Sequence, residues 1–336
     1  MPEKITVLGA GSWGIAIANL LHANDHRITM WEFNRADFEY LSANRTHPQK
    51  LPGIRIADEI TLSDDLRYAA DGADFIIFAV PAQKVRSVCE FLNEFVKGAM
   101  KYVNLAKGVE IGSLLRMSEL INSTLVSSRQ EHIATLSGPS HAEEVSRNIP
   151  TSVVVASTGL RYAEEVQRLF SGRFFRVYRS TDLVGVELGG ALKNVIAIAS
   201  GITQGLGFGD NTTGALLTRG LAEITRMGVK LGADPLTFAG LSGIGDLITT
   251  CVSKHSRNRH VGERIGKGEK LAEILSSMVM VAEGVDTCRS AYAMAEKHDV
   301  EMPITTEVFK ILFEDKPAFD ALSDLMGRSL KEEVWN

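Results

Sequence analysis

The stretch KITVLGAGSWGIAIANLL, residues 4–21, decides the fold expected for this chain. A short β-favouring run over residues 4–8 leads straight into a turn with glycine at positions 9, 11 and 14, and apolar residues at helical spacing follow from Ile15. A Gly-x-Gly-x-x-Gly turn between a strand and a helix is the context in which this motif predicts dinucleotide binding. The alternative, an accidental glycine-rich turn, is disfavoured because strand, turn and helix are all present in this order.

Each glycine of the turn has a different structural task. Gly9 permits the tight turn after the strand, Gly11 lets the backbone approach a pyrophosphate, and Gly14 lets the helix pack closely on the strand. The unpaired N–H groups at the start of the helix are available to the phosphates. We therefore expect this part of the chain to bind a dinucleotide cofactor.

The end of the expected second strand, residues 27–31, bears on the choice between NAD and NADP. Glu32 lies 18 residues after Gly14, near the position of the acid that binds the ribose of NAD. Asn34 and Arg35 follow at once, and an arginine there suits the 2′-phosphate of NADP. Because Glu32 could also be a solvated strand end, both cofactors stay open, and Arg35 favours NADP. Arg35→Ala should then weaken the binding of NADPH far more than that of NADH.

Four further apolar runs have the length and composition of buried strands, and helical patterns separate them. The expected strands are residues 74–80, 102–106, 133–136 and 152–156, and the helical patterns include residues 84–96 and 114–125. Alternating strands and helices predict a mostly parallel, doubly wound sheet, whose ligands lie beyond the carboxyl ends of the strands. Residues 174–178 are expected to be the last strand. From residue 182 the pattern is helical, so we expect an α/β chain with a Rossmann domain over residues 1–181 and an all-α domain over residues 182–336.

Polar residues follow two of these strands at the edge where ligands are expected. Lys107 comes directly after the strand at residues 102–106, and a turn with Gly138 and Ser140 follows the next strand. That turn leads into a helix that starts at Ala142, whose N-terminus favours an anion. Taken alone, Lys107 could equally solvate a strand end, and the turn could be an ordinary helix cap.

The longest apolar run, residues 188–201, carries Lys193 and Asn194 in its middle. A lysine is almost never fully buried without a partner, so its position calls for an explanation. Either the stem packs and the ammonium group reaches water, or the ammonium group faces a cleft and does chemistry. The glycines and the two polar residues favour a domain-core helix over a membrane span.

Two loops of the helical half carry the remaining polar candidates. Asp246 stands beside glycines just before a short helical pattern, and Ser256, Arg257 and Asn258 form a compact set of donors that suits a phosphate group. Each loop, taken alone, is more often a helix cap or a solvated surface loop.

The composition argues against several other classes of protein. With 36 basic and 41 acidic residues the formal net charge is −5, which gives no sign of nucleic-acid binding. Cys89, Cys251 and Cys288 are far apart and form no disulfide framework, which fits a cytoplasmic protein, and the start of the chain does not read as a secretory signal. His22 and His26 lack an evident third ligand, so no metal site is expected.

Taken together, these motifs resemble those of the soluble, bacterial type of NAD(P)-dependent glycerol-3-phosphate dehydrogenase. The matching stretches, in order along nearly the whole chain, are residues 9–14, 106–108, 137–144, 187–194, 205–209, 241–251, 256–259, 281–284 and 301–304. The blocks around Lys193 and Ser256 are far more specific than the glycine motif. The resemblance implies a Rossmann domain and a helical substrate domain, a homodimer, and reversible reduction of dihydroxyacetone phosphate to sn-glycerol 3-phosphate, which feeds phospholipid synthesis.

The resemblance also assigns roles to residues at matching positions. The residues implied to contact the cofactor, besides the three glycines of the turn, are Ser12, Trp13, Asn34, Arg35, Lys107, Ala142, Arg257, Val281 and Glu283. The residues implied to contact the substrate are Gly138, Ser140, Asn194, Asp246, Ser256, Arg257 and Asn258, with Lys107 and Lys193 between the substrate and the nicotinamide. Residues 32–34 depart from the small-then-basic pattern common in the bacterial enzymes, which leaves the cofactor choice open.

The expected chemistry places Lys193 as the acid–base residue. A lysine serves if burial or a neighbouring cation such as Lys107 lowers its pKa toward neutrality. Lys107 or Asn194 would polarise the carbonyl, and Asp246 would either hold Lys193 or accept a substrate hydroxyl. Two alternatives stay open: a β-hydroxyacid or 6-phosphogluconate-type dehydrogenase, which also uses a lysine on the first long helix of its second domain, and a non-catalytic dinucleotide sensor. The Ser256 loop argues against the first, and the set of three charged residues argues against the second.

Overall fold

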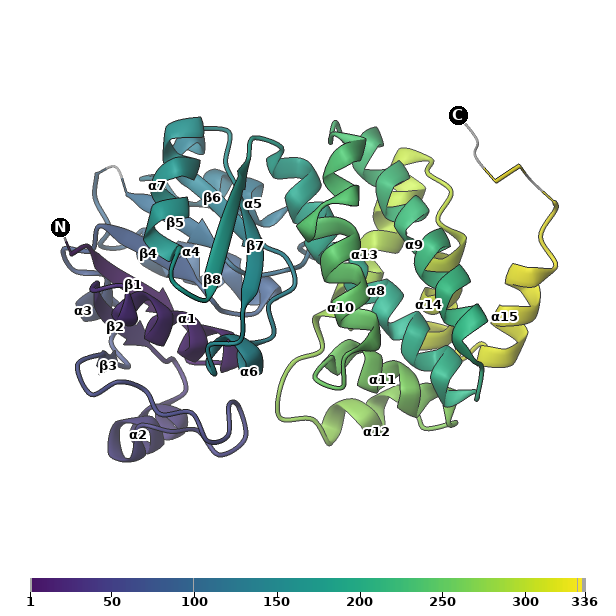
Figure 1. Ribbon diagram of the computed structural model, residues 1–336, viewed down its shortest axis with the longest axis horizontal. Coiled ribbons are helices and arrows are strands. Elements are labelled where there is room, and N and C mark those ends of the chain that lie inside the picture. Colours follow the sequence, from purple (N-terminus) through teal and green to yellow (C-terminus); the bar gives the residue numbers. More distant parts are fainter. Residues whose placement is uncertain (1, 99, 331, 334–336) are drawn as a thin grey trace.

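The computed structural model describes residues 2–98, 100–330 and 332–333, and the molecule has two parts that lie side by side (Figure 1). The amino-terminal part is a sheet with helices against both faces, and the carboxyl-terminal part is helical. The chain passes from one to the other at Asp182, whose side chain accepts a hydrogen bond from the Gly185 backbone N–H at 2.9 Å. The predicted fold class, a doubly wound α/β part followed by an all-α part, is confirmed.

The described residues form one sheet of eight strands in the order β3-β2-β1-β4-β5-β6-β7-β8. The strands are β1 (Lys4–Leu8), β2 (Arg27–Trp31), β3 (Thr61–Ser63), β4 (Phe75–Phe78), β5 (Lys101–Asn104), β6 (Ile133–Ser137), β7 (Thr151–Ala156) and β8 (Phe175–Ser180). Neighbouring strands are parallel except for β6 and β7, so the sheet is mostly parallel, as predicted. The strand order reverses between β1 and β4, and in such sheets ligands bind beyond the carboxyl ends at the reversal.

Strand residues alternate between two apolar cores, one on each face of the sheet. In β4, Phe75 and Ile77 join one core, and Ile76 and Phe78 join the other. All four side chains are buried, as expected for a parallel strand covered on both faces. The helices of this part are α1 (Ser12–Ala23), α2 (Arg35–Asn44), α3 (Leu66–Ala70), α4 (Val85–Leu92), α5 (Met117–Thr124), α6 (Ala142–Val145) and α7 (Leu160–Phe170), with 3₁₀ turns at Ala82–Lys84 and Gln130–His132.

Two departures from the expected elements concern the edge of the sheet where ligands bind. The strand expected over residues 74–80 ends at Phe78, and the residues that follow it line a cavity instead. The segment between β6 and β7 contains only the four-residue helix α6. A connection between two neighbouring parallel strands usually needs a longer helical crossover. β7 accordingly pairs with β6 in the antiparallel direction.

The helical part is built around α8 (Leu183–Gly205), nearly all of whose residues are buried. The other helices of this part are α9 (Asp210–Lys230), α10 (Asp246–Val252), α11 (Arg257–Gly266), α12 (Leu271–Ser276), α13 (Glu283–His298), α14 (Pro303–Phe313) and α15 (Ala318–Met326), with a 3₁₀ turn at Pro235–Ala239 and a π turn at Leu241–Gly245. Within the described ranges, α8 is the one helix with the length and hydropathy of a membrane span, and 94% of its apolar window is buried inside the protein. α8 is therefore the core helix of the helical part, as predicted, and not a membrane span.

Glycines let α8 and α11 approach until their backbones almost touch. A Cβ atom on Gly201 of α8 would lie 2.0 Å from the Arg259 carbonyl oxygen, and one on Gly262 of α11 would lie 2.0 Å from that of Ile198. This close crossing fixes the N-terminus of α11, which Ser256 caps, beside the middle of α8.

Gly262→Ala is expected to destabilise the protein by about 1–3 kcal/mol, because the added methyl group would push two helix backbones apart. Gly214→Ala in α9 is the matched control. Its Cβ atom would meet nothing within 4 Å, so this change should be neutral or should stabilise by up to about 1 kcal/mol. Urea denaturation of both variants measures the difference, and equal stabilities would contradict the close packing of α8 on α11.

Candidate active site between the two parts

A cavity of about 490 Å³ lies between the two parts of the molecule, next to the carboxyl ends of β1, β4 and β5. The predicted site residues that line it are Gly9, Gly11, Ser12, Trp13, Asn34, Lys107, Ser140, Ala142, Lys193, Asn194, Ser256, Arg257, Asn258, Val281 and Glu283. The remaining predicted residues, Gly14, Arg35, Gly138 and Asp246, are not among its lining residues. Gly14, Gly138 and Asp246 lie in a second layer, where each contacts a residue that lines the cavity. Arg35 does not.

The glycine turn and the start of α1 form the part of the cavity suited to a dinucleotide. Gly9 has φ +104°, and a Cβ atom on Gly14 would lie 1.9 Å from the Gly9 carbonyl oxygen, so both positions require glycine. A Cβ atom on Gly11 would meet nothing within 4 Å, which leaves the backbone at the N-terminus of α1 open to a ligand. These positions fit the pyrophosphate of a dinucleotide cofactor.

The end of β2 places Glu32 in the cavity and Arg35 outside it. Glu32 is only 4% exposed, and its carboxylate accepts hydrogen bonds from the backbone N–H groups of Ala10 at 3.2 Å and Asn34 at 2.9 Å. Glu32 is therefore no solvated strand end. Arg35, the residue on which the preference for NADP was based, is exposed and pairs with carboxylates on the outer surface.

Three charged residues meet at the opposite end of the cavity, around the buried carboxylate of Asp246. Lys193 Nζ donates to Asp246 Oδ1 at 2.7 Å and to Thr250 Oγ1 at 2.5 Å. Lys107 Nζ donates to Asp246 Oδ2 at 2.7 Å and to the Gly138 carbonyl oxygen at 2.9 Å. One carboxylate therefore holds two ammonium groups, one from each part of the molecule.

Burial and this cluster set the protonation of its members. Burial lowers the pKa of Lys193 to about 8, with the negative charge of Asp246 acting against that shift and the positive charge of Lys107 adding to it. Burial alone would raise the pKa of Asp246, but the two ammonium groups outweigh it and hold that pKa below its ordinary value. Asp246 is therefore charged at neutral pH, and Lys193 titrates close to neutrality.

A chain of amide groups fixes the two lysines relative to α11 and α13. Asn194 Nδ2 donates to the Lys107 carbonyl oxygen at 3.2 Å, and Asn194 Oδ1 accepts from Asn258 Nδ2 at 2.9 Å. Asn258 Oδ1 in turn accepts from the Gly284 backbone N–H at 2.9 Å. The side chains of Asn194 and Asn258 thus connect the end of β5, α8, α11 and α13.

The N-terminus of α11 opens into the cavity close to these amides. Ser256 is its cap and accepts a hydrogen bond from the Arg259 backbone N–H at 3.2 Å. Arg257 lies at the first position of the helix and donates to the Val281 carbonyl oxygen at 2.9 Å. Backbone N–H groups at a helix start and an arginine beside them can hold an anion such as a phosphate.

The predicted residue Glu283 lies at the start of α13, where the two parts of the molecule meet. Its Oε1 accepts a hydrogen bond from the Ala82 backbone N–H at 3.1 Å, and burial raises its pKa to about 7. A Cβ atom on Gly108 would lie 3.6 Å from Glu283 Oε2. This carboxyl group therefore lies next to the chain that carries Lys107.

Several lining residues were missed by the sequence analysis. Among them are Phe33, Asp37, Lys50, His141, Thr250 and His255. A signal existed for Thr250, since it stands four residues after Asp246 on the predicted helix and so shares its face. For Lys50 there was none, because the loop that carries it reaches the cavity only through the tertiary fold.

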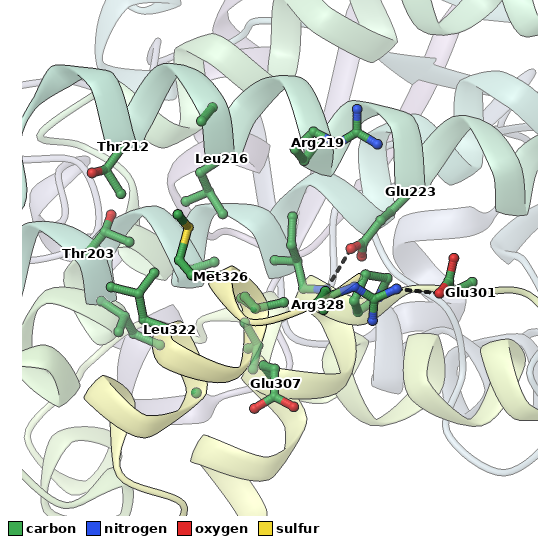
Figure 2. A pocket seen from close by; sticks show the side chains of 18 of the residues that line it. Thr203, Thr212, Leu216, Arg219, Glu223, Glu301, Glu307, Leu322, Met326 and Arg328 are labelled. Atoms are coloured by element: carbon green, nitrogen blue, oxygen red, sulfur yellow. Dashed lines mark hydrogen bonds and ion pairs between the residues drawn. The ribbon is translucent and has the colours of Figure 1, made fainter. Parts of the chain in front are cut away.

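A second cavity of about 430 Å³ lies wholly within the helical part, among α8, α9, α14 and α15 (Figure 2). More than half of its lining residues are apolar. The buried carboxylate of Glu223 accepts hydrogen bonds from the backbone N–H groups of Ile304 at 2.6 Å and Thr305 at 3.1 Å, so it caps α14. Within the described ranges, no three potential metal-binding side chains come together in either cavity.

Comparison with known proteins gives the same result for both parts of the chain. The family model described as NAD-dependent glycerol-3-phosphate dehydrogenase N-terminus matches residues 4–163, and the one described as NAD-dependent glycerol-3-phosphate dehydrogenase C-terminus matches residues 182–323.

Curated proteins and a solved structure agree with these matches. A glycerol-3-phosphate dehydrogenase of the NAD(P)+ type from Thermoanaerobacter sp. is 50% identical over 331 residues, which are 98% of this chain and 99% of that one. Its counterpart from Geobacter sulfurreducens is 48% identical over 335 residues, which are 100% of both chains. The crystal structure of glycerol-3-phosphate dehydrogenase from Coxiella burnetii superposes with a TM-score of 0.93 at 33% identity, and the match covers 97% of this chain and 99% of that one.

Proposed function

The chain belongs to the NAD-dependent glycerol-3-phosphate dehydrogenase family, and from this premise we propose a mechanism in which Lys193 is the acid–base residue. The protein is an NAD(P)-dependent oxidoreductase that interconverts dihydroxyacetone phosphate and sn-glycerol 3-phosphate. The observation that carries the mechanism is the buried carboxylate of Asp246, which two lysines share beside the cofactor cavity.

The cofactor is assigned to the glycine turn. Gly9, Gly11 and the N-terminus of α1 would hold its pyrophosphate, and the Gly11 backbone is open to a ligand. When bound, NAD(P) would supply the hydride chemistry at C2, as the acceptor for oxidation of glycerol 3-phosphate and as the donor for reduction of dihydroxyacetone phosphate. The cavity continues from this turn to the two lysines, so one ligand can lie along it with its reactive end next to the substrate.

Lys193 moves the proton that accompanies hydride transfer. During oxidation, its neutral Nζ takes the proton of the C2 hydroxyl, so an O–H bond breaks and an N–H bond forms. During reduction, the ammonium group returns that proton to the carbonyl oxygen. A pKa of about 8 allows both states near neutral pH. Two of the three N–H groups of the ammonium bind Asp246 and Thr250, which leaves one for the substrate.

Lys107 is assigned to polarise the oxygen on C2. Its ammonium group uses two donors on Asp246 and Gly138, and one remains for the substrate. Asn194 was the alternative for this role, but its amide donates to the Lys107 carbonyl oxygen and accepts from Asn258. We therefore assign Asn194 the positioning of the Lys107 backbone.

The substrate phosphate is assigned to the N-terminus of α11, with Ser256, Arg257 and Asn258. This helix start opens into the same cavity, and Asn258 ties it to α8 one residue beyond Lys193. A phosphate held there is within the same cavity as the two lysines. In the turn after β6, the Gly138 carbonyl oxygen accepts hydrogen bonds from Lys107 Nζ and from Ser140 Oγ, so this turn holds Lys107 in place from its own side of the cluster.

Arg257→Ala is expected to raise KM for dihydroxyacetone phosphate by about 10- to 100-fold, because a charge-assisted contact to the phosphate is lost. Steady-state kinetics with saturating cofactor measure the effect. Arg289→Ala, on α13 and outside the lining of the cavity, is the control and should leave KM unchanged. If unphosphorylated dihydroxyacetone served the wild-type protein equally well, the assignment of the phosphate to α11 would be wrong.

A substrate panel tests the proposed function as a whole. With NAD+ or NADP+, we expect oxidation of sn-glycerol 3-phosphate and no comparable oxidation of β-hydroxyacids or 6-phosphogluconate. Turnover of those acids would favour the related dehydrogenases, and binding of cofactor without turnover of any phosphorylated substrate would favour a sensor.

The homodimer, the cytoplasmic location and the supply of glycerol 3-phosphate to phospholipid synthesis stay predictions. They derive from the resemblance and from the wide spacing of the three cysteines, all of which are buried and free.

A further inference from the structure

A second charged cluster lies at the opposite end of the cavity from the two lysines, where β2 ends. Lys50 Nζ lies 2.6 Å from Asp37 Oδ2 and 3.6 Å from Glu32 Oε2. His47 Nε2 lies 3.4 Å from the other oxygen of Asp37. Two carboxylates thus share one ammonium group at the wall of the cavity, and the proposed mechanism uses none of these residues.

The Glu32 carboxylate is held in one orientation. The Ala10 backbone N–H, inside the glycine turn, donates to its Oε2, and the Asn34 backbone N–H donates to its Oε1. Two backbone N–H donors and the nearby Lys50 ammonium group therefore fix both oxygens of this buried side chain. Its remaining lone pairs can accept hydrogen bonds from a ligand that lies along the glycine turn.

The neighbouring residue offers a surface for the adenine of the cofactor. Phe33 follows Glu32 directly, lines the cavity and is 68% exposed. An exposed aromatic ring in a ligand cavity is a surface on which a flat base can stack. With the pyrophosphate at the glycine turn and the base at Phe33, the adenosine ribose would lie next to Glu32.

Arg35, the cation expected to bind the 2′-phosphate of NADP, points away from the cavity. Arg35 Nε pairs with Glu39 at 3.0 Å, its Nη1 lies 3.6 Å from Asp64, and its side chain is 79% exposed. Arg35 stands at the first position of α2, and from there its side chain follows the outer surface of that helix. Lys50, a cation that does line the cavity beside Glu32, pairs with Asp37 and also lies close to the Glu32 carboxylate.

We propose that Glu32 selects the cofactor, so that this chain prefers NAD(H) over NADP(H). The carboxylate accepts hydrogen bonds from the ribose hydroxyls of NAD and repels the 2′-phosphate of NADP. Removal of the Glu32 charge removes this repulsion and leaves Lys50, now with one carboxylate neighbour instead of two, able to contact a 2′-phosphate. This inference rests on the cofactor assignment of the proposed function and extends it to the choice between the two cofactors.

Binding of NADH and NADPH to the purified protein, followed by their fluorescence without substrate, tests the proposal. The wild type should bind NADH at least about 10-fold more tightly than NADPH. Glu32→Gln should change the ratio of the two dissociation constants by about 10- to 100-fold toward NADPH. The double variant Glu32→Gln, Lys50→Ala should lose the gain in NADPH affinity.

Arg35→Ala is the matched control, since it removes a nearby cation that lies outside the cavity. Its ratio of dissociation constants should equal that of the wild type. If Arg35→Ala weakened NADPH far more than NADH, or if the wild type preferred NADPH, the proposal would be overturned. If Glu32→Gln is poorly folded by thermal denaturation, Glu32→Ser serves in its place, with the same expected change of ratio.

The outcomes also separate this inference from the proposed function. A wild-type protein that binds neither cofactor would contradict both. A protein that binds both cofactors and reduces dihydroxyacetone phosphate, but keeps its ratio in both Glu32 variants, would contradict only the role of Glu32.

Discussion

Replacing Lys193 by alanine is expected to lower turnover by about 10²- to 10⁴-fold, the range that a positioned acid–base group contributes. The loss should appear in kcat in both directions, since the same nitrogen takes the proton during oxidation and returns it during reduction. The variant should still bind cofactor, because the glycine turn lies at the other end of the cavity. Steady-state kinetics and fluorescence titration with NADH measure the two properties separately.

The matched control for this variant is Lys230→Ala, which removes an exposed lysine at the end of α9 in the same helical part. It should leave kcat unchanged. Lys193→Arg gives a second check, because arginine keeps the positive charge but does not release its proton in this pH range. A kcat near that of the wild type in either Lys193 variant would remove Lys193 from the acid–base role.

Asp246→Asn is expected to lower the free energy of unfolding by about 3–5 kcal/mol at neutral pH, because two partly or fully buried ammonium groups lose the charge between them. Urea denaturation measures this loss. The pKa of Asp246 is lowered in the folded protein, so its stabilising contribution is present at neutral pH and is lost as the pH falls through the lowered value. The stability difference between variant and wild type should therefore shrink in acid.

In the proposed mechanism Asp246 acts on the reaction through Lys193, so its variant should also change the pH profile. Loss of the negative charge removes the effect that opposes the downward shift of the Lys193 pKa. The pH at which oxidation begins should move below that of the wild type. Asp58→Asn, which breaks an exposed ion pair with Arg55, is the control and should cost about 1 kcal/mol or less. An equal loss of stability in both variants, or an unchanged pH profile in Asp246→Asn, would contradict the shared-carboxylate account.

The sequence was informative where local pattern and chemistry agree. The glycine turn predicted the dinucleotide site because strand, turn and helix are contiguous in the chain. Lys193 stood out because a charge in the middle of an apolar helix requires a partner. Its partner, however, is 53 residues away, and that of Lys107 is 139 residues away. The sequence offered Asp246 two roles, and only the packing of α10 against α8 brings it between the lysines.

The least predictable features depend on the direction in which a side chain leaves its helix. Arg35 lies only four residues after the end of β2, yet it starts α2 and points outward, whereas Lys50 reaches the cavity from a loop. The contact between Gly201 and α11 could not be predicted from the sequence either. A glycine in an apolar helix can give the backbone flexibility or allow another helix to approach closely. Such features require knowledge of which elements are neighbours.

The pH dependence of kcat/KM for oxidation of sn-glycerol 3-phosphate tests the central claim most directly. Lys193 must be neutral to accept the proton, so in the wild type kcat/KM should rise with pH through a pKa of about 8 and then reach a plateau. The residual activity of Lys193→Ala should lack that rise. If the same rise persisted in Lys193→Ala, another group would be the base, and the account of the Asp246 cluster would be wrong.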